Sequence, residues 1–429
     1  MKYILQTCVL CVCVCGQEVL GYASNRQHQS FLDDIFGDIA ISDQAEEYRN
    51  QQIEMGELAD TMQTLDRDSS LMFRTNKLHF PDDDDLSDFS KYVPLYSGIV
   101  TFAHLPQEEC FTNTDSTLDI AIVGAPFDSG VSYSPGTRFG PNGVRQGSRR
   151  LGYGLTPIRG NSADSKLRHI DPYGEGLRIV DCGDVPMTPF DARISLNQLY
   201  RGERAIHKHD TALKSTHYKK TRVITLGGDH TITLMNLRSA FETYGNESLA
   251  VVHFDAHIDT WDPEVVGGNV SKYASINHGT FLHYASELGY VSKGHSVHVG
   301  TRAPYITLES KHHDKECGFK TITSKDVDIL TSRGVGRKIK EIVGDRKVYL
   351  TFDLDTFDIG YINSGTLEAG GLTPREVLTI LDELEGIDLV GCDIVEVSTP
   401  PNSYDGDNTG LLAAQVIDSL LGLMVVTEV

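Results

Sequence analysis

Cysteine is scarce outside the first fifteen residues, and tryptophan is nearly absent. The chain has 429 residues, eight cysteines and one tryptophan. Four cysteines lie within residues 8–15, and the remaining four, Cys110, Cys182, Cys317 and Cys392, are far apart and lack the paired spacing of a zinc motif. We therefore expect no disulfide framework. Cys182 and Cys392 stand in apolar runs and are expected to be buried thiols.

Positive charge and long apolar runs are also in short supply. The sequence holds 38 Lys and Arg against 60 Asp and Glu, a net charge of −22. So acidic a chain is a poor partner for nucleic acid, and its field favours the approach of a cationic small molecule. Beyond the N-terminus no apolar run reaches the roughly 20 residues that cross a bilayer, so we expect no membrane span.

The N-terminus has the pattern of a secretory leader. Lys2 precedes an apolar run from Ile4 to Cys15, which predicts a signal peptide over residues 1–20 with cleavage between residues 15 and 23. Residues 21–91 are predicted to form an acidic, loosely ordered extension, since residues 17–90 contain 17 acidic and 5 basic side chains. Residues 92–429 should form the folded domain. The expected location is the secretory pathway or the exterior of the cell.

Strand-like and helix-like runs alternate from about Tyr92 onward. Alternation of this kind predicts a mostly parallel sheet with helices on both faces. The strand-like runs are residues 118–123, 177–180, 223–226, 249–254, 296–299, 348–352 and 389–397, and the clearest helix-like runs are 232–244, 335–343 and 374–384.

Potential metal ligands follow three of these runs. In the segment from His253 to Asp259, an extended backbone places Asp255, His257 and Asp259 on one side. His230 follows Gly227-Gly228-Asp229, and Asp353 and Asp355 close another run. Imidazole and carboxylate ligands without thiolate favour manganese or magnesium over structural zinc. The sequence therefore predicts two divalent cations at the carboxyl edge of the sheet, where they activate water for hydrolysis.

These motifs resemble those of the ureohydrolases, the arginase and agmatinase family. The resemblance rests on residues 227–230, 255–259, 353–355, 124–128 and 134–141, and it extends from about Ser97 to the C-terminus. Within the family the chain is most similar to secreted-type fungal agmatinase-like members, through residues 101–106 and 259–261. The resemblance implies an arginase-like α/β/α sandwich of three layers around about eight mostly parallel strands, two Mn²⁺ per chain, and a homotrimer or homohexamer.

The resemblance also implies the role of each site residue. Asp255 and Asp353 would bridge both ions, His230 and Asp259 would complete one coordination sphere, and His257 and Asp355 would complete the other. Asp259 would also carry a proton. Glu396 would bind the guanidinium group, and His278, in Asn277-His278-Gly279, would contact the substrate and relay protons. The implied reaction is hydrolysis of a guanidino compound to urea and an amine.

Substrate choice depends on the loops around this site. Trp261, Asp262 and Glu264 follow the second motif and suit an amine tail, so we expect agmatine, giving putrescine and urea in polyamine metabolism. Trp261 could equally belong to the core. Guanidinobutyrate or another guanidino acid is the alternative. The loop Asp358–Gly371 lacks the prolines usual in the family and the loop Ser398–Thr409 is longer than usual, which leaves the substrate range open.

Two other classes of function are compatible with part of the pattern. A catalytically impaired metal-binding pseudoenzyme would retain the sheet and the ligands without turnover. A histone-deacetylase-like hydrolase would use a single zinc, which the second histidine-bearing ligand set disfavours. No motif surrounds His312 and His313, which are expected on the surface.

Overall fold

The structure is a computed structural model that describes residues 100–113, 115–152, 159–213, 219–267, 270–399 and 404–427, without the side chains of 404–407. The predicted signal peptide over residues 1–20 and the acidic extension over residues 21–91 lie outside the described residues.

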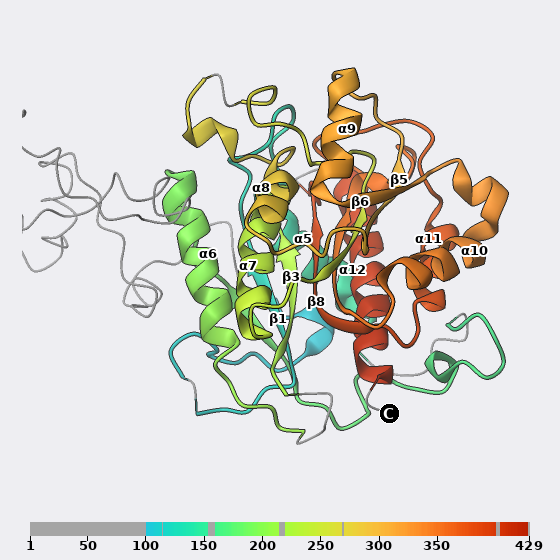
Figure 1. Cartoon of the computed structure of the whole chain (residues 1–429). Helices are drawn as coiled ribbons and strands as arrows, with labels where there is room; N and C mark the ends of the chain where they lie inside the picture. The colour runs from blue at the N-terminus through green and yellow to red at the C-terminus, as the bar shows by residue number, and fades with distance from the viewer. Residues whose placement is uncertain are drawn as a thin grey trace, which may run out of the picture. The chain divides into compact units, whose positions relative to one another are not determined.

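A parallel sheet of eight strands forms the centre of the domain (Figure 1). The strands are β1 (Ile120–Ala125), β2 (Ile179–Asp184), β3 (Arg222–Gly227), β4 (Ala250–Phe254), β5 (Ser296–Thr301), β6 (Phe319–Thr323), β7 (Lys347–Asp353) and β8 (Asp388–Val395). Their order across the sheet is β2-β1-β3-β8-β7-β4-β5-β6, and each neighbouring pair is parallel. The predicted fold class is confirmed, and all seven predicted strands are present with shifted ends.

Helices cover both faces of the sheet. They are α5 (Gly140–Gly147), α6 (Ala192–Ile206), α7 (Thr233–Thr243), α8 (Phe281–Glu287), α9 (Leu308–Cys317), α10 (Asp326–Val343), α11 (Pro374–Glu383) and α12 (Tyr404–Val426). Figure 1 shows α6, α7 and α8 on one side of the sheet and α10, α11 and α12 on the other. Every residue of β1, β3 and β4 is buried, as expected where helices cover both faces.

The apolar helix α12 packs in the core beside α5 and β8. Its segment Asn408–Val426 has a mean hydropathy of 1.8 and is long enough to cross a bilayer, so the prediction that no later segment has that length and composition is wrong. Of this segment, 83% is buried inside the fold. A helix that is apolar on all sides is expected where neighbouring elements enclose it.

A disulfide joins Cys110 to Cys182, with their Cα atoms 5.5 Å apart. Cys182 lies in β2, and residues 106–108 run beside that strand, where the Asp181 N–H donates to the Pro106 carbonyl at 2.9 Å. The prediction of a free Cys182 thiol is therefore wrong, and the expectation of no disulfide framework missed this one bond. Cys317 and Cys392 are buried free thiols, as predicted for Cys392.

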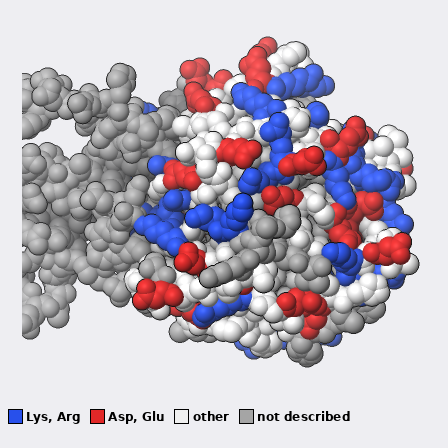
Figure 2. Space-filling model, turned by 60° about the horizontal axis from the view of Figure 1, so that its bottom comes forward, with Lys and Arg blue, Asp and Glu red and all other residues white. Residues whose placement is uncertain are grey.

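The surface carries charges of both signs. Figure 2 shows one face on which Lys and Arg are interspersed with Asp and Glu. On this face the net charge of the chain does not gather into a single acidic patch.

Candidate metal centre and active site

The four central strands of the sheet bring the predicted site residues together. Strands β3, β8, β7 and β4 are consecutive neighbours, and their carboxyl ends meet at one edge of the sheet. His230 follows β3, Glu396 follows β8, Asp353 ends β7, and Asp255 follows β4. Ligands of open parallel sheets bind at this edge. Segments far apart in sequence thus lie side by side, because their strands are neighbours in the sheet.

His230 faces three carboxylates. Its Nδ1 atom lies 3.1 Å from Asp255 Oδ2, 3.1 Å from Asp259 Oδ2 and 3.2 Å from Asp353 Oδ2. On the other side of the ring, Nε2 lies 2.7 Å from the Thr351 hydroxyl oxygen, which fixes the orientation of the imidazole. All these side chains are buried or nearly so.

A second group of ligand atoms adjoins the first through Asp255. His257 Nδ1 lies 3.1 Å from Asp255 Oδ1 and 3.0 Å from Asp355 Oδ2. The two oxygens of Asp255 therefore face different histidines. Asp353 Oδ1 accepts the N–H of Asp355 at 2.7 Å, which ties the last residue of β7 to the aspartate in the turn that follows. The structure thus groups His230 with Asp259 and His257 with Asp355, around a shared Asp255.

The electrostatics of the cluster fit a pair of divalent cations. Burial and the nearby charges of Asp355 and Asp255 raise the pKa of Asp353 well above its usual value. Burial and the charge of Asp255 raise the pKa of Asp259 to about 6. His230 Nδ1, Asp255 Oδ2 and Asp355 Oδ2 are buried and have no hydrogen-bond partner within the described part of the chain. Metal ions would satisfy these atoms and neutralise the carboxylates at once.

His253 belongs to the same cluster and was not predicted. It is fully buried, and its Nε2 lies 3.0 Å from Asp255 Oδ2. Its Nδ1 lies 2.7 Å from His298 Nδ1, and His298 Nε2 lies 2.9 Å from Asp314 Oδ1. Burial lowers the pKa of His253 to about 3, so its ring is neutral. Its two-residue spacing from Asp255 was the available signal, since it places both side chains on the same side of an extended strand.

His278 and Glu396 form a pair beside the metal cluster. His278 Nδ1 lies 3.3 Å from Glu396 Oε1, and His278 Nε2 lies 2.8 Å from the Ser132 hydroxyl oxygen. Burial opposes the charged ring, yet the hydrogen bond and charge of Glu396 with the charge of Asp259 raise the pKa of His278 to about 9. Glu396 Oε1 also accepts the N–H of His230 at 3.0 Å, whereas its Oε2 is buried and has no partner among the residues that the structure describes.

Asp259 and Glu396 have backbone conformations that non-glycine residues rarely adopt. Their φ angles are 50° and 57°. The Leu282 N–H donates to the Asp259 carbonyl at 3.1 Å, and the Glu396 N–H donates to the Gly228 carbonyl at 2.9 Å. Left-handed non-glycine residues cost about 1–3 kcal/mol each and gather at functional sites. The surrounding fold therefore holds both carboxylates in position at a cost in stability.

A cavity of about 210 Å³ opens onto these residues. Its lining comprises Ser132, His257, Asp259, Trp261, Val266, His278, Gly279, Ile306, Asp353 and Thr366. Trp261 is half-buried in this wall, so its side chain belongs to the pocket and not to the core. A Cβ atom on Gly279 would lie 2.8 Å from the Trp261 ring, so glycine is needed there for the indole to pack. A larger depression of about 850 Å³ near α10 and α11 contains none of the predicted site residues.

The unusual loop Asp358–Gly371 folds against the site. The Asp358 carboxylate accepts the N–H groups of Gly370 and Gly371 at 2.8 and 3.0 Å. Arg302 donates to the carbonyls of Asp355 and Glu368 at 2.5 and 2.8 Å. Side-chain hydrogen bonds thus hold this loop, which contains no proline.

A parallel α/β sheet with a buried histidine and carboxylate cluster at its carboxyl edge defines a hydrolase of the metal-dependent type. Residues 118–422 match the arginase family. A Schizosaccharomyces pombe protein with the provisional name agmatinase 1 is 40% identical over 352 residues, which are 78% of this chain and 84% of the relative. A guanidinobutyrase of Pseudomonas aeruginosa is 32% identical over 330 residues, covering 77% and 93%.

Comparison with a solved structure supports the same family. Proclavaminate amidinohydrolase of Streptomyces clavuligerus superposes with a TM-score of 0.63 at 30% identity, over 78% of this chain and 100% of that one. The chain therefore belongs to the arginase family, and it is an enzyme that hydrolyses a guanidino compound.

Proposed function

We propose that the enzyme hydrolyses agmatine to putrescine and urea. The observation that carries this proposal is the lining of the cavity beside the metal cluster, which includes no Lys or Arg among the described residues. A substrate tail that ends in an ammonium group fits such a wall better than one that ends in a carboxylate. The half-buried indole of Trp261 adds a surface on which a cation can lie.

The metal cluster is assigned to two Mn²⁺ ions. Asp255 and Asp353 would bridge them, with His230 and Asp259 on one ion and His257 and Asp355 on the other. The ligand set, oxygen-rich with imidazole and no thiolate, supports manganese. When bound, such a pair of cations supplies a strong nucleophile from water near neutral pH.

Glu396 is assigned to the guanidinium group of the substrate. It is fully buried, and its Oε2 atom has no partner among the described residues. A buried carboxylate with a free oxygen is a strong acceptor for a charged N–H donor. A Cβ on Gly365 would lie 3.1 Å from this oxygen, so glycine leaves room beside it.

Asp259 and His278 are assigned to proton transfer. The guanidinium carbon is a poor electrophile, and the amine must gain a proton before it leaves. Asp259, which lies beside His230 Nδ1 in the cluster, is the carboxylate assigned to carry this proton to the amine. His278, with a pKa of about 9, holds a proton at neutral pH between Glu396 and Ser132, at the cavity wall.

A guanidino acid such as 4-guanidinobutyrate is the second candidate substrate. The indole N–H of Trp261 is buried and has no acceptor among the described residues. A carboxylate tail could accept that hydrogen bond, and one of the relatives is named a guanidinobutyrase.

A substrate panel distinguishes these candidates. Urea release is measured with Mn²⁺ and agmatine, arginine, 4-guanidinobutyrate, 3-guanidinopropionate or guanidine. We expect the highest kcat/KM with agmatine. A preference for 4-guanidinobutyrate would identify the second candidate, and no urea from any compound would indicate the catalytically impaired pseudoenzyme. Elemental analysis gives the metal: fewer than two manganese ions per chain in protein saturated with Mn²⁺ would contradict the dinuclear manganese assignment.

We also propose that the protein enters the secretory pathway and assembles as a homotrimer or homohexamer. The Cys110–Cys182 disulfide is of the kind that persists in oxidising compartments, and Asn246, in the sequon Asn246-Glu247-Ser248, is exposed. Detection of the protein in the culture medium, with a mass that falls on deglycosylation, tests the location. Light scattering of the purified protein tests the assembly, and a monomeric mass would contradict it.

A further inference from the structure

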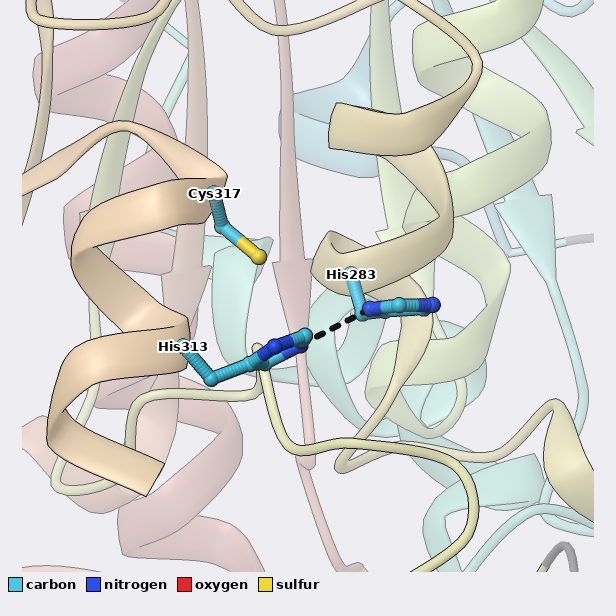
Figure 3. A group of neighbouring side chains, drawn as sticks. All are labelled: His283, His313 and Cys317. Atoms are coloured by element: carbon cyan, nitrogen blue, oxygen red, sulfur yellow. Dashed lines mark hydrogen bonds between the residues drawn. The ribbon is translucent and has the colours of Figure 1, made fainter. Parts of the chain in front are cut away.

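Two histidines and a cysteine meet between helices α8 and α9, outside the proposed active site (Figure 3). His283 comes from α8, and His313 and Cys317 come from α9, four positions apart and so on one face of that helix. His283 Nδ1 lies 2.9 Å from His313 Nε2, and all three ligand atoms lie within 4.8 Å of one another. Of these residues, His313 had been predicted on the surface, whereas it is half-buried against His283.

The scaffold around the three side chains is fixed. The Ser286 hydroxyl of α8 donates to the Cys317 carbonyl at 2.9 Å, and Lys293 Nζ donates to the Glu316 carbonyl at 2.8 Å. Cys317 is 4% exposed, whereas the His283 side chain is 19% exposed. The cluster therefore has a buried sulfur end and a nitrogen end that solvent can reach.

A carboxylate stands behind the outer ring nitrogen of His283. Glu287, one turn further along α8, places its Oε2 3.6 Å from His283 Nε2. Metal-binding histidines usually direct their second ring nitrogen to such a partner, which leaves the first nitrogen for the ion. Here the first nitrogen is Nδ1, the atom that faces His313.

We propose that His283, His313 and Cys317 bind one Zn²⁺ ion, with the fourth position open to solvent. Nitrogen and sulfur ligands at bond lengths of about 2.0–2.3 Å are typical of tetrahedral zinc, which places neighbouring ligand atoms roughly 3.3–3.8 Å apart. One ligand atom from each residue lies within 4.8 Å of the others, and the two facing histidine nitrogens are 2.9 Å apart, so small side-chain rotations would give the tetrahedral spacing.

The proton balance of binding is simple. Burial and the charge of Asp314 raise the pKa of the Cys317 thiol to about 12, so the cysteine is protonated before the ion binds. Burial and the nearby His313 lower the pKa of His283, which favours its neutral form. The ion therefore replaces one proton, the thiol proton, which is released to solvent.

The ligand type separates this site from the proposed dinuclear one. The dinuclear cluster has carboxylates and imidazoles, and the α8–α9 cluster is the one of the two that has a thiol. Mn²⁺ has little affinity for thiolate, so the two sites can be filled with different metals. The ion would clamp α8 to α9 next to Asp314, whose carboxylate accepts the Thr260 hydroxyl at 2.7 Å.

Cobalt substitution tests the site. Full-length protein saturated with Mn²⁺ is titrated with Co²⁺, whose bond to a thiolate absorbs in the near ultraviolet. We expect an absorption band that saturates at one Co²⁺ per chain and disappears when Zn²⁺ is added. The band should be lost in Cys317→Ser and in His313→Gln. His312→Gln, an exposed neighbour on the same helix, should keep it.

Thermal unfolding provides a readout that does not depend on the buried cysteine. In Mn²⁺ buffer, Zn²⁺ should raise the melting temperature of the wild type and of His312→Gln, with a much smaller rise in His313→Gln. The proposal is overturned by the absence of a thiolate band in the wild type, by a band of equal size in Cys317→Ser, or by equal zinc shifts in the two histidine variants. The rate of urea release with Mn²⁺ should stay within about twofold of the wild-type rate in His313→Gln, because the three side chains of the cluster are not among the residues assigned to substrate binding or catalysis.

Discussion

At the scale of single residues, one carboxylate connects the two halves of the metal cluster. The two oxygens of Asp255 face His230 and His257 separately. Asp353 Oδ2 also lies beside His230 Nδ1, and Asp353 Oδ1 accepts the backbone N–H of Asp355. Removal of either aspartate should therefore disturb both ion positions together.

Asp353→Ala should release metal and abolish turnover. Even loss of a hydrogen-bonded partner behind a ligand lowers metal affinity or activity by about 10- to 100-fold, so loss of a shared ligand should exceed 100-fold. Elemental analysis and urea release measure the two effects. Asp345→Asn, an exposed aspartate before β7, is the matched control. Full manganese content in Asp353→Ala would contradict the bridging role.

His278→Ala should separate catalysis from metal binding. The ring contacts Glu396 and Ser132 and none of the six proposed metal ligands by hydrogen bond. We expect kcat to fall by about 10²–10⁴-fold, the usual contribution of a positioned proton donor, with unchanged manganese content. Steady-state kinetics and elemental analysis are the measurements, with His312→Ala as control. A parallel loss of manganese would show that His278 supports the cluster instead.

The ionisation of Glu203 should make the stability of the domain depend on pH. Glu203 is fully buried in α6, accepts the Thr225 hydroxyl at 2.7 Å, and has a pKa raised by burial to about 8. The pKa of Glu203 in the folded protein exceeds the ordinary value of 4.5. The stability that Glu203 contributes to the fold is therefore fully present below about pH 4.5 and is lost as the pH rises through about 8.

Glu203→Gln, which stays neutral, should therefore match the wild type near pH 4.5. Near pH 9 it should exceed the wild type in free energy of unfolding by on the order of 3–5 kcal/mol, because the pKa rises from 4.5 to about 8 and each unit corresponds to about 1.4 kcal/mol. Denaturant unfolding at both pH values measures this difference. The exposed Glu309→Gln on α9 should show no such gain. An equal difference at both pH values would exclude ionisation of Glu203 as the cause.

At the scale of elements, the contact between α5 and α12 depends on small residues. A Cβ on Gly147 would lie 2.2 Å from the backbone carbonyl of Gly410, and a Cβ on Gly410 would lie 2.4 Å from the carbonyl oxygen of Gly143. Backbone atoms cannot rotate away from such a collision. The two helices must separate if either position gains a side chain.

Gly147→Ala should consequently destabilise the domain by about 1–3 kcal/mol, the usual cost of overpacking. The unfolding midpoint in denaturant measures the loss. Gly360→Ala is a suitable control, because a Cβ there meets only Asp358 Oδ1, at 4.0 Å. Equal midpoints for the two variants would mean that α5 and α12 adjust freely.

Elements with a local pattern were predicted, and those set by tertiary contacts were not. The predicted strands have continuous apolar runs because they are buried on both faces. The missed strand, β6, lies at the sheet edge and reads Phe-Lys-Thr-Ile-Thr, of which three residues are exposed. The metal motifs could be found because each lies within a few residues. The partnership of Cys110 with Cys182, 72 residues apart, has no local pattern and depends on the path of the chain along β2.

At the scale of the whole molecule, the proposed active site and the disulfide place different requirements on the cellular compartment. Its proposed active site needs a divalent cation and water, which most compartments supply. Its disulfide needs an oxidising compartment to form and persist. The free thiols Cys317 and Cys392 are both buried, which limits their exchange with the disulfide.

The disulfide should therefore contribute measurably to stability in the oxidised protein. It closes a loop across 72 residues, and bonds of this kind stabilise a fold by about 2–4 kcal/mol, largely through the unfolded chain. Denaturant unfolding of the Cys110→Ser/Cys182→Ser double variant should show a loss of this size. A reductant should lower the stability of the wild type and of Cys317→Ser to a similar extent, and should leave the double variant unchanged. Wild-type protein from the culture medium that is insensitive to reductant would argue against the bond, and with it against the main structural support for secretion.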